Sequence, residues 1–171
     1  WVGHASWAIL NGGFDQWKAE KRPLDTAFPA VTPRQYTARV GADTFTVDVE
    51  GVKAALGDGR TQILDTRPAD YFSGAKSEEA RAGHIPGAVN REFKMDLVPD
   101  KEILQDESRL REAYAKLGID GSRPVIVQCR TGHQASQTYF TLKYVLGFPD
   151  VRWFDASWSA WAAREDLPLE K

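Results

Sequence analysis

The single cysteine of the chain, Cys129, lies in the segment best equipped for chemistry. It is followed by Arg130, which carries a permanent positive charge, and then by Gly132 and by His133, whose imidazole can titrate. A structural cysteine would more naturally lie among apolar residues than in a turn of this composition. The thiolate is the nucleophilic form of cysteine, and neighbouring cations stabilise it. The sequence therefore favours Cys129 as a nucleophile over a packing residue.

A buried strand and a helix must position this cysteine. Residues 125–127 are a continuous apolar run, typical of a strand buried on both faces, and residues 134–146 have apolar side chains at helical spacing. In parallel sheets, ligands bind where strands end and helices begin. A loop at this junction directs backbone N–H groups toward the thiol, and the helix N-terminus adds partial positive charge. Gly132 allows the loop a backbone conformation with positive φ.

Two kinds of nucleophilic cysteine use an anion-binding loop of this type. Cysteine-dependent phosphatases, and arsenate reductases with them, place an arginine six positions after the cysteine, where it binds phosphoryl oxygens with two hydrogen bonds. In this chain that position is Ala135. The shorter loop favours sulfur as the attacked atom, with a persulfide formed on Cys129. Phosphate chemistry is thus the less favoured alternative.

Helix and strand patterns alternate through the rest of the chain. Asp48 can cap a helix over 49–56, and a further helix is expected over 107–117. Short strands are expected at 63–64 and 88–90. This alternation predicts an α/β fold with three layers, in which a mainly parallel sheet has helices on both faces.

Two segments far apart in the chain resemble each other. Residues 9–17 (ILNGGFDQW) match residues 153–161 (WFDASWSAW) in the order of their apolar, Asn/Asp and aromatic positions, and a Pro-Leu pair follows each. Both predict a short buried strand, a turn and a short aromatic helix, and such repetition indicates tandem domains. We therefore expect residues 1–26 to be the C-terminal remnant of a preceding domain. Residues 27–40 contain prolines and are expected to be a linker, and residues 41–171 the domain that carries Cys129.

The motifs around Cys129 resemble those of the rhodanese-like sulfurtransferases, the family of thiosulfate and 3-mercaptopyruvate sulfurtransferases. Four motifs, in the family's order and spacing, carry the resemblance: ILDTRPADYF, AGHIPGAVN, the active-site loop QCRTGHQAS and the closing motif WFDASWSAW. The match covers residues 45–171. The partial copy at residues 9–17 and the insert between Tyr71 and Gly83 are similar to the C-terminal half of tandem rhodaneses, which carries the active cysteine.

The resemblance implies a ping-pong sulfur transfer. The thiolate of Cys129 attacks the outer sulfur of a small anionic donor such as thiosulfate, sulfite leaves, and the persulfide passes its sulfur to cyanide or another thiophilic acceptor. No cofactor and no metal ion are implied. In tandem rhodaneses the active site lies between the two halves, so a preceding rhodanese-like domain of the same protein is an expected partner.

The resemblance also suggests which residues serve the site. The active-site loop comprises Arg130, Thr131, Gly132, His133, Gln134 and Ala135. Arg130, His133 and Arg81 are the expected cations for an anionic donor. We expect Asp65 to form a buried pair with Arg130 and so to support the loop.

Other charged residues are given smaller roles. Arg67 either contacts the substrate or ties the strand of Asp65 to a helix. His84 is expected to be a hydrogen-bonded turn residue, and Glu78 and Glu79 an ordinary solvated face.

The loop differs from both subtypes of the family. Mercaptopyruvate-type loops resemble Cys-Gly-Ser-Gly, with a serine at the position of Thr131. Many thiosulfate-type tandem enzymes have a basic residue there and often an arginine in the segment aligned with Tyr71. Arg130 and His133 could replace those cations, so we favour thiosulfate, with 3-mercaptopyruvate as the alternative. A second alternative is a persulfide carrier that delivers sulfur to a protein partner without free turnover.

Bulk composition sets the outer limits. The 171 residues suffice for one domain and an extension, and 42% of them are hydrophobic. The net charge of −2 gives no electrostatic reason to expect nucleic acid or an anionic membrane as a partner. No apolar run approaches the roughly 20 residues of a membrane helix. Of the two compartments considered, cytoplasm and periplasm, we favour the cytoplasm.

Overall fold

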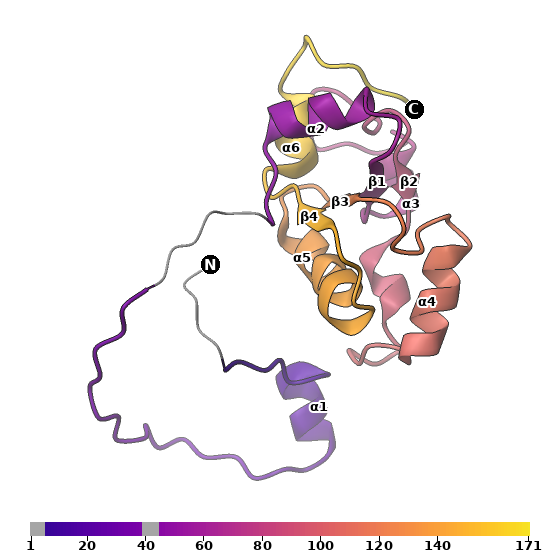
Figure 1. Cartoon of the computed structure of the whole chain (residues 1–171). Coiled ribbons are helices and arrows are strands. Elements are labelled where there is room, and N and C mark those ends of the chain that lie inside the picture. The colour runs from indigo at the N-terminus through magenta and orange to yellow at the C-terminus, as the bar shows by residue number, and fades with distance from the viewer. Residues whose placement is uncertain (1–5, 39–44) are drawn as a thin grey trace. The chain divides into compact units, whose positions relative to one another are not determined.

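A computed structural model of the chain describes residues 6–38 and 45–171 (Figure 1). The chain divides into two compact units. The smaller consists of residues 1–43 with 97–104, and the larger of residues 44–96 with 105–171. The expected boundary between the linker and the Cys129 domain falls at residues 39–44, outside the described residues.

A parallel sheet forms the centre of the larger unit. Its strands lie side by side in the order β2-β1-β3-β4, and every neighbouring pair is parallel. Asp65 at the end of one central strand is in register with Gln128 at the end of the other. The strands are β1 (Gln62–Asp65), β2 (Val89–Asn90), β3 (Val125–Gln128) and β4 (Val151–Trp153). The α/β prediction is confirmed.

Helices follow the strands as the sequence patterns indicated. The side chain of Asp48 accepts a hydrogen bond from the N–H of Gly51 at 2.8 Å and so caps the first helix of this unit. The predicted helix over 134–146 is an α-helix that continues as a π-helical turn. The helical segments are α2 (Val49–Leu56), α3 (Ala69–Phe72), η1 (Phe93–Asp96), α4 (Glu107–Ala115), α5 (His133–Phe140), η2 (Thr141–Val145) and α6 (Ser157–Ala162).

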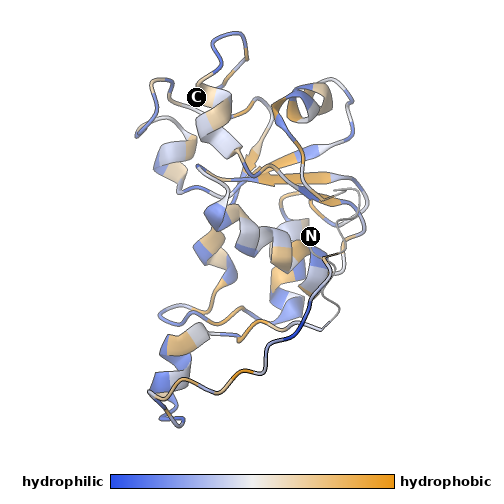
Figure 2. Cartoon of the chain, turned by 90° about the vertical axis from the view of Figure 1, so that its left-hand side faces the viewer, coloured by the Kyte–Doolittle hydropathy of each residue, from blue (hydrophilic) through white to orange (hydrophobic). Residues whose placement is uncertain are grey.

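The sheet separates two hydrophobic clusters because successive strand residues point to opposite faces. Leu64 and Val127 pack with buried residues of α4, α5 and η2. Ile63 and Ile126 pack on the other face with buried residues of α2 and α6, including Trp158. Figure 2 shows the strands as strongly hydrophobic segments in the middle of this unit. Both faces are thus covered, as a continuous apolar strand requires.

A buried polar group fastens the chain that leaves β2. The N–H of Arg91 donates to the carbonyl oxygen of Asp65 at 3.0 Å. Its guanidinium donates to Asp96 at 3.0 Å, and the hydroxyl of Tyr114 donates to the same carboxylate at 2.5 Å. All three side chains are buried. This group holds η1 against α4, beside the end of β1.

The smaller unit repeats one detail of the closing motif. Its helix, α1 (Gly13–Ala19), carries Trp17, whose indole N–H donates to the carbonyl oxygen of Pro23 at 2.9 Å. In the larger unit the indole N–H of Trp161 donates to the carbonyl oxygen of Pro168 at 2.8 Å. The two matched segments therefore share a helix followed by the same tryptophan-to-proline hydrogen bond.

The expected strand in the first copy is wrong. Ile9 and Leu10 are 60% and 56% exposed, and no described residue pairs with them as a strand. A two-residue strand needs a neighbour such as β3 provides for β4, and the described part of this unit offers none. Phe14 of the helix in this copy is exposed as well, whereas Trp158 and Trp161 of the second copy are fully buried. Residues 27–38 of the expected linker contain no helix or strand.

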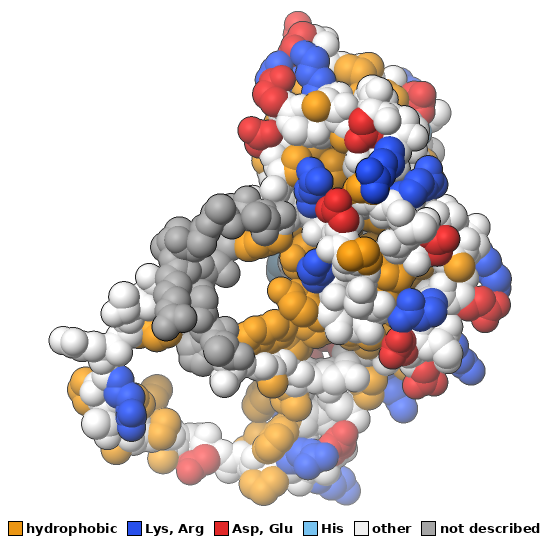
Figure 3. Space-filling model, in the orientation of Figure 1, with side chains coloured by type: hydrophobic (Ala, Val, Ile, Leu, Met, Phe, Trp, Pro, Cys, Tyr) orange, Lys and Arg blue, Asp and Glu red, His pale blue; other side chains and the backbone are white. Residues whose placement is uncertain are grey.

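The surface of the larger unit carries charges of both signs. On the face shown in Figure 3, acidic and basic side chains are interspersed. Among the described residues, none of the helices has the length and apolarity to cross a membrane.

The buried group around Asp96 yields a test of stability. Asp96→Asn keeps the shape but leaves the Arg91 guanidinium without its carboxylate, so we expect a loss of about 3 kcal/mol in the free energy of unfolding. Urea unfolding followed by tryptophan fluorescence measures it. Glu112→Gln removes the same charge from an exposed pair with Lys116 and should leave the transition midpoint in place. Equal midpoints for the two variants would contradict the role given to Asp96.

Candidate active site

Cys129 lies directly after β3, at the carboxyl end of the sheet. Its side chain is only 1% exposed. Residues 129–132 form the turn, and α5 begins at His133. The predicted junction of strand, loop and helix is therefore confirmed.

The start of α6 holds this loop through hydrogen bonds to the loop backbone. The N–H of Cys129 donates to the hydroxyl oxygen of Ser157 at 3.2 Å. In return the N–H groups of Trp158 and Ser159 donate to the carbonyl oxygens of Cys129 and Arg130, at 3.1 and 3.0 Å. Ser157 has a φ of 52°, a conformation that costs energy for a non-glycine residue. Only its place in the closing motif marked this serine in the sequence.

A glycine is required at position 132 for two reasons: its backbone conformation, and the close approach of Asp155. Its φ is 84°, and a Cβ atom at this position would lie 2.4 Å from the carbonyl oxygen of Asp155 and 2.3 Å from its carboxylate. The carbonyl oxygen of Gly132 accepts a hydrogen bond from the indole of Trp153 at 3.2 Å. The loop is thus packed directly against the chain that follows β4.

The backbone of the loop presents donors without acceptors. Among the described residues, no acceptor faces the backbone N–H groups of residues 130–135 within hydrogen-bonding distance. The next N–H group along the chain, that of Ser136, donates to the carbonyl oxygen of Gly132 at 3.1 Å. Such consecutive N–H groups at a helix N-terminus favour an anion. This arrangement suits a thiolate and the negative charge of a persulfide.

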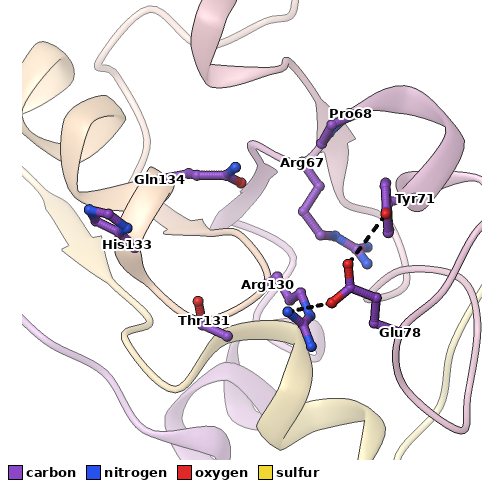
Figure 4. A pocket seen from close by; sticks show the side chains of 8 residues that line it. All are labelled: Arg67, Pro68, Tyr71, Glu78, Arg130, Thr131, His133 and Gln134. Atoms are coloured by element: carbon purple, nitrogen blue, oxygen red, sulfur yellow. Dashed lines mark hydrogen bonds and ion pairs between the residues drawn. The ribbon is translucent and has the colours of Figure 1, made fainter.

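A pocket of about 270 Å³ lies over the loop. Its lining residues come from the loop, from the start of α3 and from the insert: Arg67, Pro68, Tyr71, Glu78, Arg130, Thr131, His133 and Gln134 (Figure 4). The structure thus brings four of the expected loop residues to one cavity. Ala135 and Cys129 are buried and do not line this pocket.

Arg130 is paired with the two carboxylates of the insert, not with Asp65. Its Nε donates to Glu79 at 2.8 Å, and its Nη1 lies 2.5 Å from the carboxylate of Glu78. The hydrogen bond to Glu79 is the largest of the effects that raise the pKa of the Arg130 guanidinium, and the charge of Glu78 adds to it. The expected pair with Asp65 is wrong, as is the view of Glu78 and Glu79 as an ordinary solvated face. Sequence spacing did not reveal that the insert folds back onto the loop.

Asp65 and Arg67 instead pair with each other. The Nη2 of Arg67 donates to Asp65 at 2.7 Å and to the carbonyl oxygen of Gly83 at 2.8 Å, and both side chains are buried. The guanidinium also lies 4.8 Å from the ring centre of Trp158. Burial raises the pKa of Asp65, and its bonds to Arg67 oppose that shift. Arg67 therefore ties the end of β1 to Gly83, not to a helix through a hydrogen bond, and it also lines the pocket.

Arg81 does not reach the pocket. Its guanidinium donates to the carbonyl oxygens of Arg164 and Leu167, the latter at 2.6 Å. The expectation that Arg81 serves the pocket over the loop is therefore wrong, because both of its terminal nitrogens donate to carbonyls elsewhere and Arg81 is not among the lining residues. It fixes the base of the insert against the C-terminal segment.

The two histidines have different surroundings. His84 is buried, with its Nδ1 2.9 Å from the carbonyl oxygen of Phe72, and this confirms a hydrogen-bonded turn residue. His133 is exposed, and in Figure 4 its ring lies away from the Arg130 guanidinium. Among the described residues, no three His, Cys, Asp or Glu side chains are grouped so that they could hold a metal ion.

Residues 48–164 match the family model of the rhodanese-like domain, so the chain belongs to the rhodanese-like domain family. The sulfur carrier protein TtuD of Thermus thermophilus is 31% identical over 99% of this chain and 63% of its own length. A thiosulfate sulfurtransferase of Pseudomonas aeruginosa is 33% identical over 99% of this chain and 61% of its own length. The chain thus spans about three fifths of these relatives.

Solved structures show the same fold. An anaerobic ergothioneine biosynthesis enzyme from Chlorobium limicola, in complex with trimethyl histidine, matches with a TM-score of 0.84 and 24% identity, over 95% of this chain and 40% of that one. The wild-type structure of EanB matches with a TM-score of 0.83 and 22% identity, over 95% and 40%.

The contact between Gly132 and Asp155 can be tested with a matched pair of glycines. Gly132→Ala adds both a strained φ and a collision with a backbone carbonyl, so we expect it to lower the free energy of unfolding by about 3 kcal/mol. Gly147 has a φ of 69° but no atom within 4 Å of the added Cβ, so Gly147→Ala should cost only about 1 kcal/mol. Urea titrations of both variants give the comparison. Equal losses would show that the close approach does not constrain the loop.

Proposed function

We propose that this chain is the catalytic domain of a thiosulfate sulfurtransferase that works through a persulfide on Cys129. The observation that carries the proposal is the position of this thiol at the end of β3, at the start of a loop whose backbone N–H groups at residues 130–135 have no acceptor among the described residues. The names of the relatives support the donor, since several are thiosulfate sulfurtransferases.

The proposed reaction has two steps. The Cys129 thiolate attacks the outer sulfur of thiosulfate, a new S–S bond forms, and the old S–S bond breaks with its electron pair leaving on sulfite. An acceptor such as cyanide then attacks the terminal sulfur of the persulfide, and thiocyanate leaves while the thiolate returns. The N–H groups of the loop would stabilise the charge in both states of Cys129. Neither step needs an external oxidant or a cofactor.

A sulfur carrier is the second candidate. It is supported by the relative named as a sulfur carrier protein and by the burial of Cys129, which restricts free access to the persulfide. A carrier would accept sulfur once and release it only to a protein partner. 3-Mercaptopyruvate as donor is the alternative within enzymatic transfer.

We further propose that residues 1–26 are the closing segment of a second rhodanese-like domain in the same protein. The repeated hydrogen bonds, Trp17 to Pro23 and Trp161 to Pro168, support a common origin of the two segments.

Mass spectrometry of the intact protein tests the first step. After incubation with thiosulfate, the wild-type chain should gain one sulfur atom, located on Cys129 by peptide analysis and removed by dithiothreitol. Cys129→Ser should gain none, because a hydroxyl is a far weaker nucleophile at neutral pH. A wild-type chain that gains no sulfur would refute the proposal.

Steady-state thiocyanate formation separates the two candidates. An enzyme should produce thiocyanate continuously from thiosulfate and cyanide, at a rate proportional to protein. A carrier should load with one sulfur and then stop.

A further inference from the structure

The guanidinium of Arg130 is the one permanent positive charge that the active-site loop itself supplies. Two carboxylates already occupy it: Glu79 on Nε at 2.8 Å and Glu78 on Nη1 at 2.5 Å. The other cation lining the pocket, Arg67, is balanced by buried Asp65. Counted over Arg67, Arg130 and the three carboxylates paired with them, this group carries an excess of one negative charge.

The two glutamates differ in how firmly they are held. Glu79 is only 13% exposed, and its backbone N–H and carbonyl both bond to the hydroxyl of Ser77, at 3.1 and 2.9 Å. Glu78 is 49% exposed. Among the described residues, the only contact of its carboxylate besides Arg130 is a long one, 3.4 Å, from the hydroxyl of Tyr71 (Figure 4). Glu79 thus orients the guanidinium, and Glu78 is the carboxylate that can move away.

We propose that Glu78 weakens the binding of an anionic donor by occupying the anion-binding edge of Arg130, so that the donor must displace it. This inference rests on the proposed function, whose donor is a small dianion. A dianion that enters while Glu78 is in place meets like charge, which opposes binding. Once Glu78 leaves, Arg130 and Glu79 balance each other, and the loop N–H groups face the donor. Glu78 therefore raises the donor concentration needed for loading and leaves the sulfur-transfer step unchanged.

Glu78→Gln isolates this effect, because it keeps the size of the side chain and removes the charge. Rapid-quench mass spectrometry gives the rate of persulfide formation as a function of thiosulfate at fixed ionic strength. The half-saturating concentration should fall about tenfold, while the rate at saturation stays the same. Discharge of the preloaded persulfide to dithiothreitol, an uncharged thiol, should proceed as in the wild type. Glu112→Gln is the matched control for the change in net charge, and it should behave as the wild type does.

A binding measurement keeps the test independent of the chemistry. Thiosulfate is titrated calorimetrically into Cys129→Ser, with and without Glu78→Gln, and the dissociation constant should be about tenfold lower in the double variant. If the wild type never forms a persulfide, the proposed function fails, and this titration still decides the role of Glu78. A dissociation constant that is unchanged or higher in the double variant would overturn the inference. So would a change confined to the saturating rate.

Discussion

The hydrogen bonds between the Cys129 loop and residues 157–159 are the interaction on which the site depends. A loop that leaves a central strand and enters a helix could take many paths. Here the backbone groups of Cys129 and Arg130 are bonded on one side to Ser157, Trp158 and Ser159, and the N–H groups further along the loop have no partner in the described part of the chain. The strained backbone of Ser157 persists because the surrounding contacts, including the buried Trp158, determine it. An anion site built from backbone needs this external fixation.

Around this fixed backbone, the charged side chains form two separate pairs at different depths. Asp65 and Arg67 are buried together and tie the end of β1 to Gly83, so their charges serve the framework. Arg130 lies nearer the solvent and pairs with the insert. A buried pair costs much to break, whereas an exposed one exchanges readily with water or a ligand. Burial thus explains why the two pairs differ. The buried arginine–carboxylate pair stabilises the fold, whereas the more exposed pair is a contact that a ligand can displace.

The sequence was sufficient for features set by local patterns. The apolar run of β3, the cap at Asp48 and the glycine in the loop each have a local physical reason, and the strand, helix and junction were predicted from them. Contacts across the fold were not predictable in this way. The Asp65–Arg67 pair excludes an Asp65–Arg130 pair, and nothing in the spacing of Glu78 indicates that the insert reaches Arg130. Arg81 shows the same limit, since its partners are backbone carbonyls more than eighty positions away.

The two copies of the repeated motif show which of its features form locally and which need a neighbouring strand. In both copies a tryptophan of the short helix bonds to the carbonyl oxygen of a following proline, a contact that is local and forms with or without a sheet. The strand of the motif forms only in the second copy, where β3 supplies the hydrogen-bonding partner for β4. The same dependence applies to the proposed nucleophile. Cys129 obtains its environment from the strand before it, the helix after it and a closing segment that begins 28 positions further along, so the reactivity proposed for its thiol depends on the assembled sheet edge.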